Sequence, residues 1–306
     1  MSIVIDALAG PISLQDCGRF GHRHLGVSWQ GAMDQLAFES ANWLCGNPTP
    51  RAALELGPGS LTLSFEDEGY FAYCGQAHRG HLIRQGEEYR LFPGWRYPFE
   101  AGDHLNLTPS GEGVYGYLAV RGGIALPQLM DSCSTDPDLE RSKLPARPLL
   151  KGDRLPLGDQ QSPLPEIEGI ARRPHNTRLR YLPAHEEWAP AMRLLVSRSV
   201  SRMGIRLHGD HPYQLPLESV TKPVFPGAIQ LPPDGHPIVL GRGCQTTGGY
   251  PVLGYLLQPD LDHLVQSPPG CELTLEPCTL TQANQVQRQY QGYRYQLQRG
   301  LYGTGS

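Results

Sequence analysis

Hydrophobic and polar residues alternate with a period of two over many short stretches of this 306-residue chain. Such alternation is typical of β-strands that bury one face. Residues 1–6 also read as a strand, because no basic region precedes a long apolar core there, as a signal peptide would require. The other stretches predicted to be strands are 61–65, 115–120, 194–199 and 237–240. The chain is therefore predicted to be mainly β.

A short pattern recurs three times along the chain: a turn glycine, one further residue, and then leucines at alternate positions. It occupies residues 102–107, 152–157 and 270–275. The period of two predicts that the leucines of each copy lie on one buried face of a strand. Three copies of such a short pattern do not by themselves indicate duplicated domains.

Helical periodicity is confined to three segments. The first covers 34–47, where Asp34 can cap the N-terminus and Gly46, followed by Asn47 and Pro48, ends the helix. Its apolar face is predicted to consist of Leu36, Ala37, Ala41, Leu44 and Cys45.

A second, short helix is predicted over 259–266. The third and longest begins near Thr279, and its opposite face is mostly glutamine and arginine. Its apolar residues follow spacings of three and four: Leu280, Ala283, Val286, Tyr290, Tyr293 and Leu297. We expect this C-terminal helix to lie on the surface of a barrel or of a partner.

Composition agrees with many short strands joined by tight turns, since 36 glycines and 29 prolines are spread along the chain. A polar, proline-containing stretch between about 160 and 174 resembles a linker. The sequence thus predicts an N-terminal β domain over 1–160 and a C-terminal β-barrel domain with a terminal helix over 175–306.

Charge and cysteine content narrow the class of protein. The formal net charge of −4 gives no electrostatic case for nucleic acid or an anionic membrane as a partner. No apolar stretch approaches the roughly 20 residues that cross a bilayer. The seven cysteines are an odd number without a CxxC pair, which predicts reduced thiols in a cytoplasmic protein. The close histidine pairs at 22/24, 78/81 and 208/211 lack a third ligand at metal spacing, so no metal is predicted.

Three segments are candidates for chemistry. The segment Gln245-Thr246-Thr247-Gly248-Gly249-Tyr250 follows an apolar strand and combines two hydroxyls with two adjacent glycines. Backbone amides left uncovered by glycine, together with hydroxyls, suit an anion or a carbonyl oxygen. The structural alternative is a tight turn that needs positive φ.

The other two segments contain arginine, whose forked guanidinium suits a carboxylate or phosphate. In residues 15–21, Gln15, Asp16 and Arg19 could line a polar pocket, or Asp16 and Arg19 could form an internal ion pair that braces a glycine turn. In residues 201–207, Arg202 and Arg206 could bind a common anion or be exposed arginines at a strand edge.

The motifs are more specific in combination than singly. From the N-terminus they are 15–21, 31–34, 41–47, 118–124, 132–136, 202–204, 227–230 and 245–250. In this order they resemble the family called allophanate hydrolase subunit 2, the biotin-dependent-carboxyltransferase-like domain, which includes the C subunit of prokaryotic ATP-dependent 5-oxoprolinase and KipA-type proteins. The resemblance covers about residues 3–276, and Ser132 to Asp136 look especially like the oxoprolinase type.

The resemblance implies a mainly β protein of cyclophilin-like barrels that acts with a homologous B subunit (KipI-like) and a separate A subunit. It implies ATP-dependent hydrolysis of 5-oxo-L-proline, with an ATP site that a partner could share. We expect Arg19, Arg202 and the 245–250 loop to face one cleft shared with the B subunit. The expected catalytic residues are Arg202, Gln245, Thr246 and Thr247. The expected substrate-binding residues are Gln15, Asp16, Arg19, Gln230, Gly248, Gly249 and Tyr250.

The chain departs from the family pattern at several positions. Ser201 stands where an acidic or amide residue is usual, and Gly243 with Cys244 stands where a polar or acidic residue is usual. Residues 141–147 lack the expected glycine pair and Gly-Arg stretch. A missing carboxylate removes a candidate general base or cation ligand. Two alternatives follow: a non-catalytic KipA-type regulatory binding protein, and a protein related to carboxyltransferases or allophanate hydrolase. The chain has no biotin-attachment segment, so no biotin is expected on it.

Overall fold

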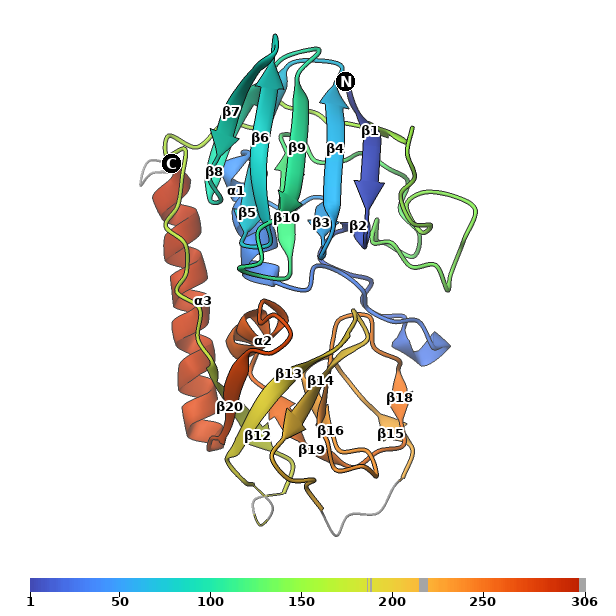
Figure 1. Cartoon of the computed structure of the whole chain (residues 1–306), viewed down its shortest axis with the longest axis vertical. Coiled ribbons are helices and arrows are strands. Elements are labelled where there is room, and N and C mark those ends of the chain that lie inside the picture. Colours follow the sequence, from blue (N-terminus) through green and yellow to red (C-terminus); the bar gives the residue numbers. More distant parts are fainter. Residues whose placement is uncertain (186, 188, 215–219, 303–306) are drawn as a thin grey trace. The chain divides into compact units, whose positions relative to one another are not determined.

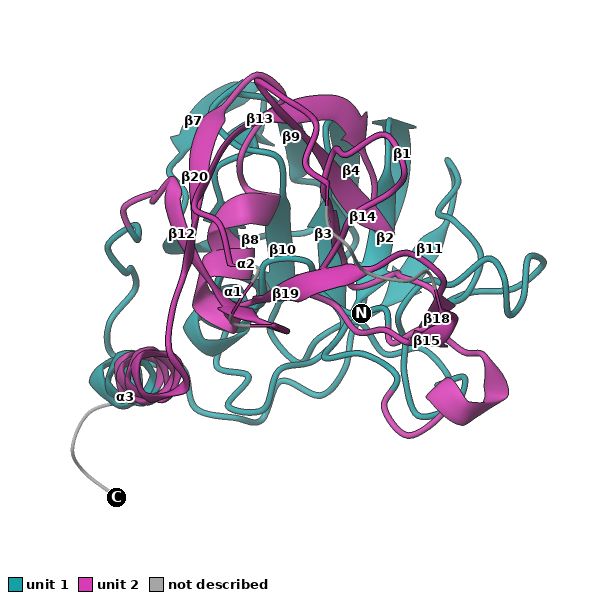
Figure 2. Cartoon of the chain, turned by 90° about the horizontal axis from the view of Figure 1, so that it is seen from below, with its two compact units in different colours: residues 1–19, 30–173, 295–306 teal, residues 20–29, 174–294 magenta. Residues whose placement is uncertain are grey.

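The computed structural model describes residues 1–185, 187, 189–214 and 220–302. The chain forms two compact units, coloured separately in Figure 2. Unit 1 contains residues 1–19, 30–173 and 295–306, and unit 2 contains 20–29 and 174–294. The boundary after residue 173 falls at the end of the predicted linker. The predicted division at 160–175 did not include the grouping of residues 20–29 with unit 2 or of residues 295–306 with unit 1.

Unit 1 is built on two β-sheets whose side chains meet in one hydrophobic core. The six-stranded sheet has the order β11 (Arg154–Pro156), β1 (Ser2–Ala9), β4 (Ser60–Phe65), β9 (His104–Pro109), β6 (His78–Arg84) and β7 (Glu87–Leu91). Figure 1 shows β1 to β7 of this order side by side, and β11 is labelled in Figure 2. The five-stranded sheet has the order β2 (Ile12–Gln15), β3 (Ala53–Leu56), β10 (Gly116–Val120), β5 (Gly69–Gly75) and β8 (Trp95–Phe99). Alternate residues of β4 are buried, as the sequence pattern predicts.

The helix α1 (Gln35–Leu44) confirms the first helix prediction. The Asp34 carboxylate accepts a hydrogen bond from the backbone N–H of Ala37, which satisfies one of the free donors at the helix N-terminus. The helix is buried on more sides than the predicted stripe, since Phe38, Ser40 and Asn42 are also buried. Ala37, predicted to lie on the apolar face, is half-buried.

Unit 2 contains a closed seven-stranded barrel. Its strand order is β12 (Arg178–Pro183), β19 (Val252–Leu256), β16 (Ala228–Gln230), β17 (Ile238–Leu240), β14 (Gly204–Gly209), β13 (Met192–Val200) and β20 (Glu272–Pro277). Among these seven described strands, β12 and β20 pair in parallel and the other neighbours pair antiparallel. The strands β15 (Lys222–Pro223) and β18 (Thr247–Gly248) form a separate pair (Figure 1). The short 3₁₀ helix η1 (Arg23–Leu25) also belongs to this unit.

The helix α2 (Gln258–Val265) is held to the barrel by a buried carboxylate. Asp260 is fully buried, and its two oxygens accept hydrogen bonds from Nε and Nη2 of Arg180 at 2.8 Å each. This pairing raises the pKa of the Arg180 guanidinium, because the hydrogen bonds to Asp260 favour its charged form. The second helix prediction is therefore confirmed, with its start one residue earlier.

The C-terminal helix α3 (Leu280–Tyr302) is present as predicted, but its apolar face is narrower. Leu280 is 62 % and Tyr293 is 40 % exposed, so both lie outside the buried stripe. The helix buries Ala283 and Tyr290, and the Tyr290 hydroxyl donates a hydrogen bond to Asp262 of α2. Exposed apolar residues of this kind are common on protein surfaces, which explains why spacing alone overestimated the buried face.

These observations confirm a mainly β fold with a β-barrel, a few short helices and a C-terminal helix. No helix in the part of the chain that the structure describes is long and apolar enough to span a membrane.

Candidate functional site

The Gln245–Tyr250 loop follows β17 in the chain and leads into β19 of the barrel. Within it, Thr247 and Gly248 form β18, which pairs with Pro223 and Lys222 of β15. The N–H of Val224 donates to the carbonyl of Thr246 at 3.1 Å, which extends the pairing. Neither Gly248 nor Gly249 has a positive φ, so the turn that needs positive φ is not the reason for the glycines.

The Arg202–Gly204 segment lies directly beside the residues that lead into this loop. The backbone N–H of Gly243 donates to the carbonyl of Arg202 at 2.8 Å, and that of Gly241 donates to the carbonyl of Met203 at 2.9 Å. Arg202 is half-buried, whereas Met203 is 56 % exposed. The structure thus brings together two motifs that are about forty residues apart in the sequence. Arg206 lies on β14 and forms an ion pair with Asp234, so its guanidinium is engaged elsewhere.

Gln230 lies at the end of β16 and is 2 % exposed. A Cβ atom added to Gly248 would lie 2.4 Å from Nε2 of Gln230. The side chain of Gln230 therefore packs against the glycine pair of the loop, and a larger residue at 248 would displace it. This places three of the predicted binding residues, Gln230, Gly248 and Gly249, in one neighbourhood.

Three positively charged residues that the sequence did not single out lie close to the loop. Arg23 of η1 donates from Nη2 to the carbonyl of Gln245 at 2.9 Å and also to that of Val224. Its guanidinium lies 5.3 Å from the ring centroids of both Trp29 and Phe225. Arg242, 5 % exposed, precedes the loop, and Lys222 stands opposite Gly248 in the strand pair.

Arg23 was missed because it lies more than 200 residues before the loop in the sequence. The only sequence signal was its position between the two glycine-containing motifs at 15–21 and 31–34. Arg242 was adjacent to Gly243 and Cys244, which were recognised only as departures from the family pattern.

Cys244 is a buried thiol that interacts electrostatically with Arg23 and Arg242. Burial raises its pKa, and the positive charges of Arg23 and Arg242 act in the opposite direction without reversing the shift. Burial likewise raises the pKa of Cys133 to about 11. Both thiols are therefore largely protonated near neutral pH. None of the seven cysteines forms a disulfide.

Residues 15–19 of the 15–21 segment belong to a hydrogen-bonded cluster in unit 1. The Asp16 carboxylate accepts hydrogen bonds from the hydroxyls of Ser132 and Ser134 at 2.7 and 2.6 Å. It also accepts bonds from the backbone N–H groups of Gly18 and Cys133 at 2.8 and 2.6 Å. Residues of the Ser132–Asp136 motif thus hold the Asp16 carboxylate in place through hydrogen bonds.

Arg19 and Gln15 are fully buried in the same cluster. Arg19 donates to the carbonyls of Leu129 and Ser134 and lies 3.5 Å from the carboxylate of Asp136. Burial lowers the pKa of Arg19, while Asp136 and Asp16 oppose the shift. The ion pair that braces this segment is therefore with Asp136 rather than the Asp16 expected as the alternative.

Gln15 accepts a bond from the N–H of Gly31 at 3.0 Å. The roles of Gln15, Asp16 and Arg19 as substrate contacts, and the cleft expected to join Arg19 with Arg202, stay predictions.

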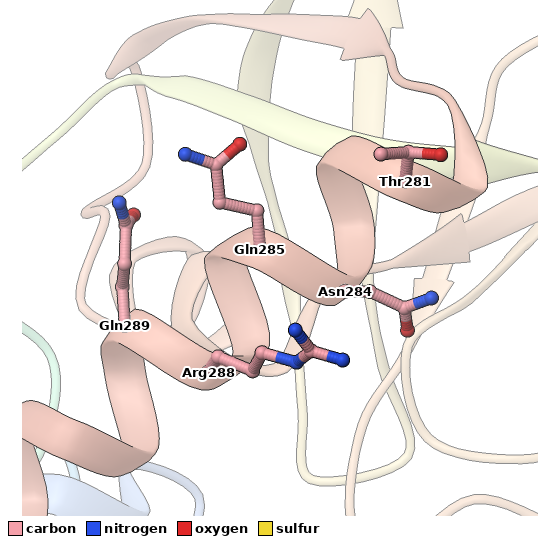
Figure 3. A pocket seen from close by; sticks show the side chains of 5 residues that line it. All are labelled: Thr281, Asn284, Gln285, Arg288 and Gln289. Carbon is pink, nitrogen blue, oxygen red and sulfur yellow. The ribbon is translucent and has the colours of Figure 1, made fainter.

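A shallow hollow runs along the exposed face of α3 (Figure 3). The side chains that line it come from successive turns of this one helix: Thr281, Asn284, Gln285, Arg288 and Gln289. They include no activated nucleophile, general base or buried charge, so the hollow is a weaker candidate than the 245–250 loop. No cluster of histidine, cysteine and carboxylate side chains suited to a metal occurs among the described residues.

Comparison with known proteins places the chain in a family. Residues 25–277 match the model of the carboxyltransferase domain, subdomain A and B. The chain is 36 % identical over 297 residues to the C subunit of 5-oxoprolinase from Escherichia coli, covering 93 % of this chain and 94 % of the relative. It is 35 % identical over 303 residues to the C subunit of 5-oxoprolinase from Haemophilus influenzae, covering 94 % of each.

A solved structure has a similar fold. The crystal structure of the protein TTHA0988 superposes with a TM-score of 0.77 and 30 % sequence identity, over 91 % of this chain. The matched region is 56 % of that protein, so the chain spans about half of its length. The family model covers most of the chain, and both curated relatives match along nearly their whole length. The chain belongs to the carboxyltransferase domain family, subdomain A and B.

Proposed function

We propose that this chain is the C subunit of an ATP-dependent 5-oxoprolinase that hydrolyses 5-oxo-L-proline to L-glutamate. The observation that carries the proposal is the 36 % identity to the C subunit of the Escherichia coli 5-oxoprolinase, along 94 % of that relative. Because the relative is named as one subunit among several, we propose a homologous B subunit and a separate A subunit as partners of this chain.

The proposed reaction explains the need for ATP. An unstrained lactam is a poor electrophile, and transfer of a phosphoryl group to its oxygen would create a leaving group. Overall, one water opens the ring and another is consumed in the hydrolysis of ATP to ADP and phosphate. Because the chain has no P-loop, the proposed ATP site is one that a partner subunit supplies or shares.

The 245–250 loop and its surroundings contain groups suited to binding such a substrate. The substrate carries a carboxylate, and three residues whose side chains suit one have their backbone beside the loop. The carbonyl of Arg202 accepts the N–H of Gly243, Arg242 precedes Gly243, and Lys222 stands opposite Gly248. The amides and hydroxyls of the loop are suited to an oxygen that gains negative charge during ring opening. In this proposal Arg202 binds the carboxylate, while Gln245, Thr246 and Thr247 orient the reacting amide.

The test is Arg202→Ala in the complex reconstituted from all subunits, with 5-oxoproline-dependent ADP release as the measurement. Loss of a charge-assisted hydrogen bond, about 1.5–3 kcal/mol, should lower kcat/KM about 10- to 150-fold. Arg206→Ala is the matched control, because Arg206 lies four residues further along the same segment but is paired with Asp234. It should leave kcat/KM close to the wild-type value.

Unchanged turnover in Arg202→Ala would show that Arg202 does not bind the substrate. Absence of ADP release from the wild-type complex would instead favour the regulatory binding protein. That alternative draws support from Gly243 and the buried Cys244, which stand where the family usually has polar or acidic residues.

A further inference from the structure

The carboxamide nitrogen of Gln230 is buried without a hydrogen-bond partner among the described residues. The side chain is 2 % exposed, and its Nε2 atom has no hydrogen-bond partner among the residues that the structure describes. Such a group is costly to bury, and most buried polar groups in proteins are paired. An apolar side chain of the same size would fill the same space without this cost. Packing therefore does not explain why an amide is present at this position.

The unsatisfied donor lies at the candidate loop. The position of a Cβ on Gly248 would be 2.4 Å from Nε2 of Gln230, and the nearest atom of another residue is Cγ1 of Val224 at 3.3 Å. Gly248 has no positive φ, so glycine is not needed here for the backbone conformation. It is needed because a side chain would clash with its neighbour. Glycine at 248 leaves the room that the carboxamide of Gln230 occupies against the loop.

The chemistry around the donor indicates what it binds. The guanidinium of Arg23 bonds to the carbonyl of Gln245, and the backbone of Arg202, Arg242 and Lys222 lies beside the loop. Such cations suit a carboxylate. Gln230 is neutral, and its unsatisfied Nε2 can only donate. A neutral donor in a buried position fits an uncharged carbonyl oxygen, whereas the cations fit the negative end of the same ligand.

We infer that Nε2 of Gln230 donates a hydrogen bond to the lactam carbonyl oxygen of the bound substrate, and so selects a cyclic amide over a simple carboxylate. This inference rests on the proposed function. The donor is preorganised by burial, so the hydrogen bond strengthens as the carbonyl oxygen gains negative charge during ring opening.

The test is Gln230→Met in the reconstituted complex, measured by calorimetric titration with three ligands. These are 5-oxo-L-proline, 2-pyrrolidinone, which has the lactam without the carboxylate, and cyclopentanecarboxylate, which has the carboxylate without the lactam. Methionine keeps the size of glutamine but has no N–H. The affinity for the two lactams should fall about tenfold, as the loss of one hydrogen bond predicts, and the affinity for cyclopentanecarboxylate should stay the same.

A second measurement separates recognition from a structural role. Because Gln230→Met removes an unsatisfied buried donor, the melting temperature of the free chain should stay the same or rise. A lower melting temperature, or an equal loss of affinity for all three ligands, would overturn the inference. Unchanged affinity of Gln230→Met for the two lactams would also overturn the inference. If the wild-type complex neither binds nor turns over 5-oxo-L-proline, the proposed function fails and this inference fails with it.

Discussion

At the scale of single residues, the two adjacent glycines of the loop should respond differently to the same change. A Cβ at Gly248 would meet Nε2 of Gln230 at 2.4 Å, whereas one at Gly249 would have only Oγ1 of Thr221 nearby, at 3.8 Å. We expect Gly248→Ala to lower the free energy of unfolding by about 1–3 kcal/mol through overpacking. Gly249→Ala should change it by less than about 1 kcal/mol, because its φ is open to alanine.

Urea unfolding of the two variants checks this difference. A Gly248→Ala, Gln230→Ala double variant supplies the control, since removal of the glutamine side chain removes the clash. Its loss should be smaller than the sum of the two single losses. Equal destabilisation at 248 and 249 would contradict the contact between Gly248 and Gln230.

The residues of the site were only partly predictable from the sequence. The sequence indicated the 245–250 loop, Arg202 and Gln230 because local composition and motif order identify them. Arg23 could not be found this way, since its bonds to Val224 and Gln245 cross more than 200 residues. Arg19 was recognised as unusual, but its partner Asp136 is far away in the sequence, and the nearer Asp16 was the natural alternative.

At the scale of elements, the recurring glycine pattern proves to be a repeated turn. Gly102, Gly152 and Gly270 have φ of +90°, +88° and +86°, and each donates its N–H to a carbonyl of a neighbouring strand. In the first two copies the next residue is aspartate, whose carboxylate accepts the N–H of the residue three positions earlier. The third copy has Cys271 in this place.

This turn predicts a pH dependence of stability. Burial alone would raise the pKa of Asp103, but hydrogen bonds from Arg84 and from the N–H of Glu100 outweigh it, and the pKa is lowered. A carboxyl with a lowered pKa in the folded state stabilises above its unfolded pKa of about 3.9. That stability is lost as the pH falls through the folded value.

We therefore expect Asp103→Asn to cost about 2 kcal/mol at pH 7 and progressively less toward a pH of about 2. Urea unfolding at several pH values measures the difference between variant and wild type. Asp138→Asn, at a carboxylate that is 91 % exposed, is the control and should stay within about 0.5 kcal/mol at each pH. A difference for Asp103→Asn that does not vary with pH would exclude the charged interaction.

Element predictions succeeded where the pattern was local and strong. The capping residue Asp34 and the stop near Gly46 fixed α1, because both act within one helical turn. The predicted stripe of α3 failed at Leu280 and Tyr293, since helical spacing shows which residues share a face but not how far a neighbour covers it.

At the scale of the whole molecule, the division of the chain was the least predictable feature. Composition indicated a linker near 160–174, and the contact boundary does fall after residue 173. Composition carries no sign that 20–29 belongs to unit 2 or that 295–306 belongs to unit 1. Those assignments depend on contacts between residues far apart in sequence, which neither periodicity nor turn chemistry encodes.

The exchanged segment 20–29 predicts that residues 174–306, produced alone, are less stable than in the full chain. The fragment lacks Arg23, which bonds to the carbonyls of Val224 and Gln245, and Trp29, whose ring lies 5.7 Å from that of Phe225. Hydrogen exchange at the Val224 amide is a direct probe, because this N–H bonds to the carbonyl of Thr246. It should exchange at least about tenfold faster in the fragment.

The Thr274 amide supplies the internal control, since it bonds to the carbonyl of Thr177 where β20 runs beside β12, and its protection should change less. Arg23→Ala in the full chain separates the single guanidinium from the whole segment. It should accelerate exchange at Val224 by a smaller factor than deletion does, because Trp29 still packs on Phe225. Equal exchange at Val224 in the fragment and the full chain would show that the 245–250 loop holds its shape without the N-terminal segment.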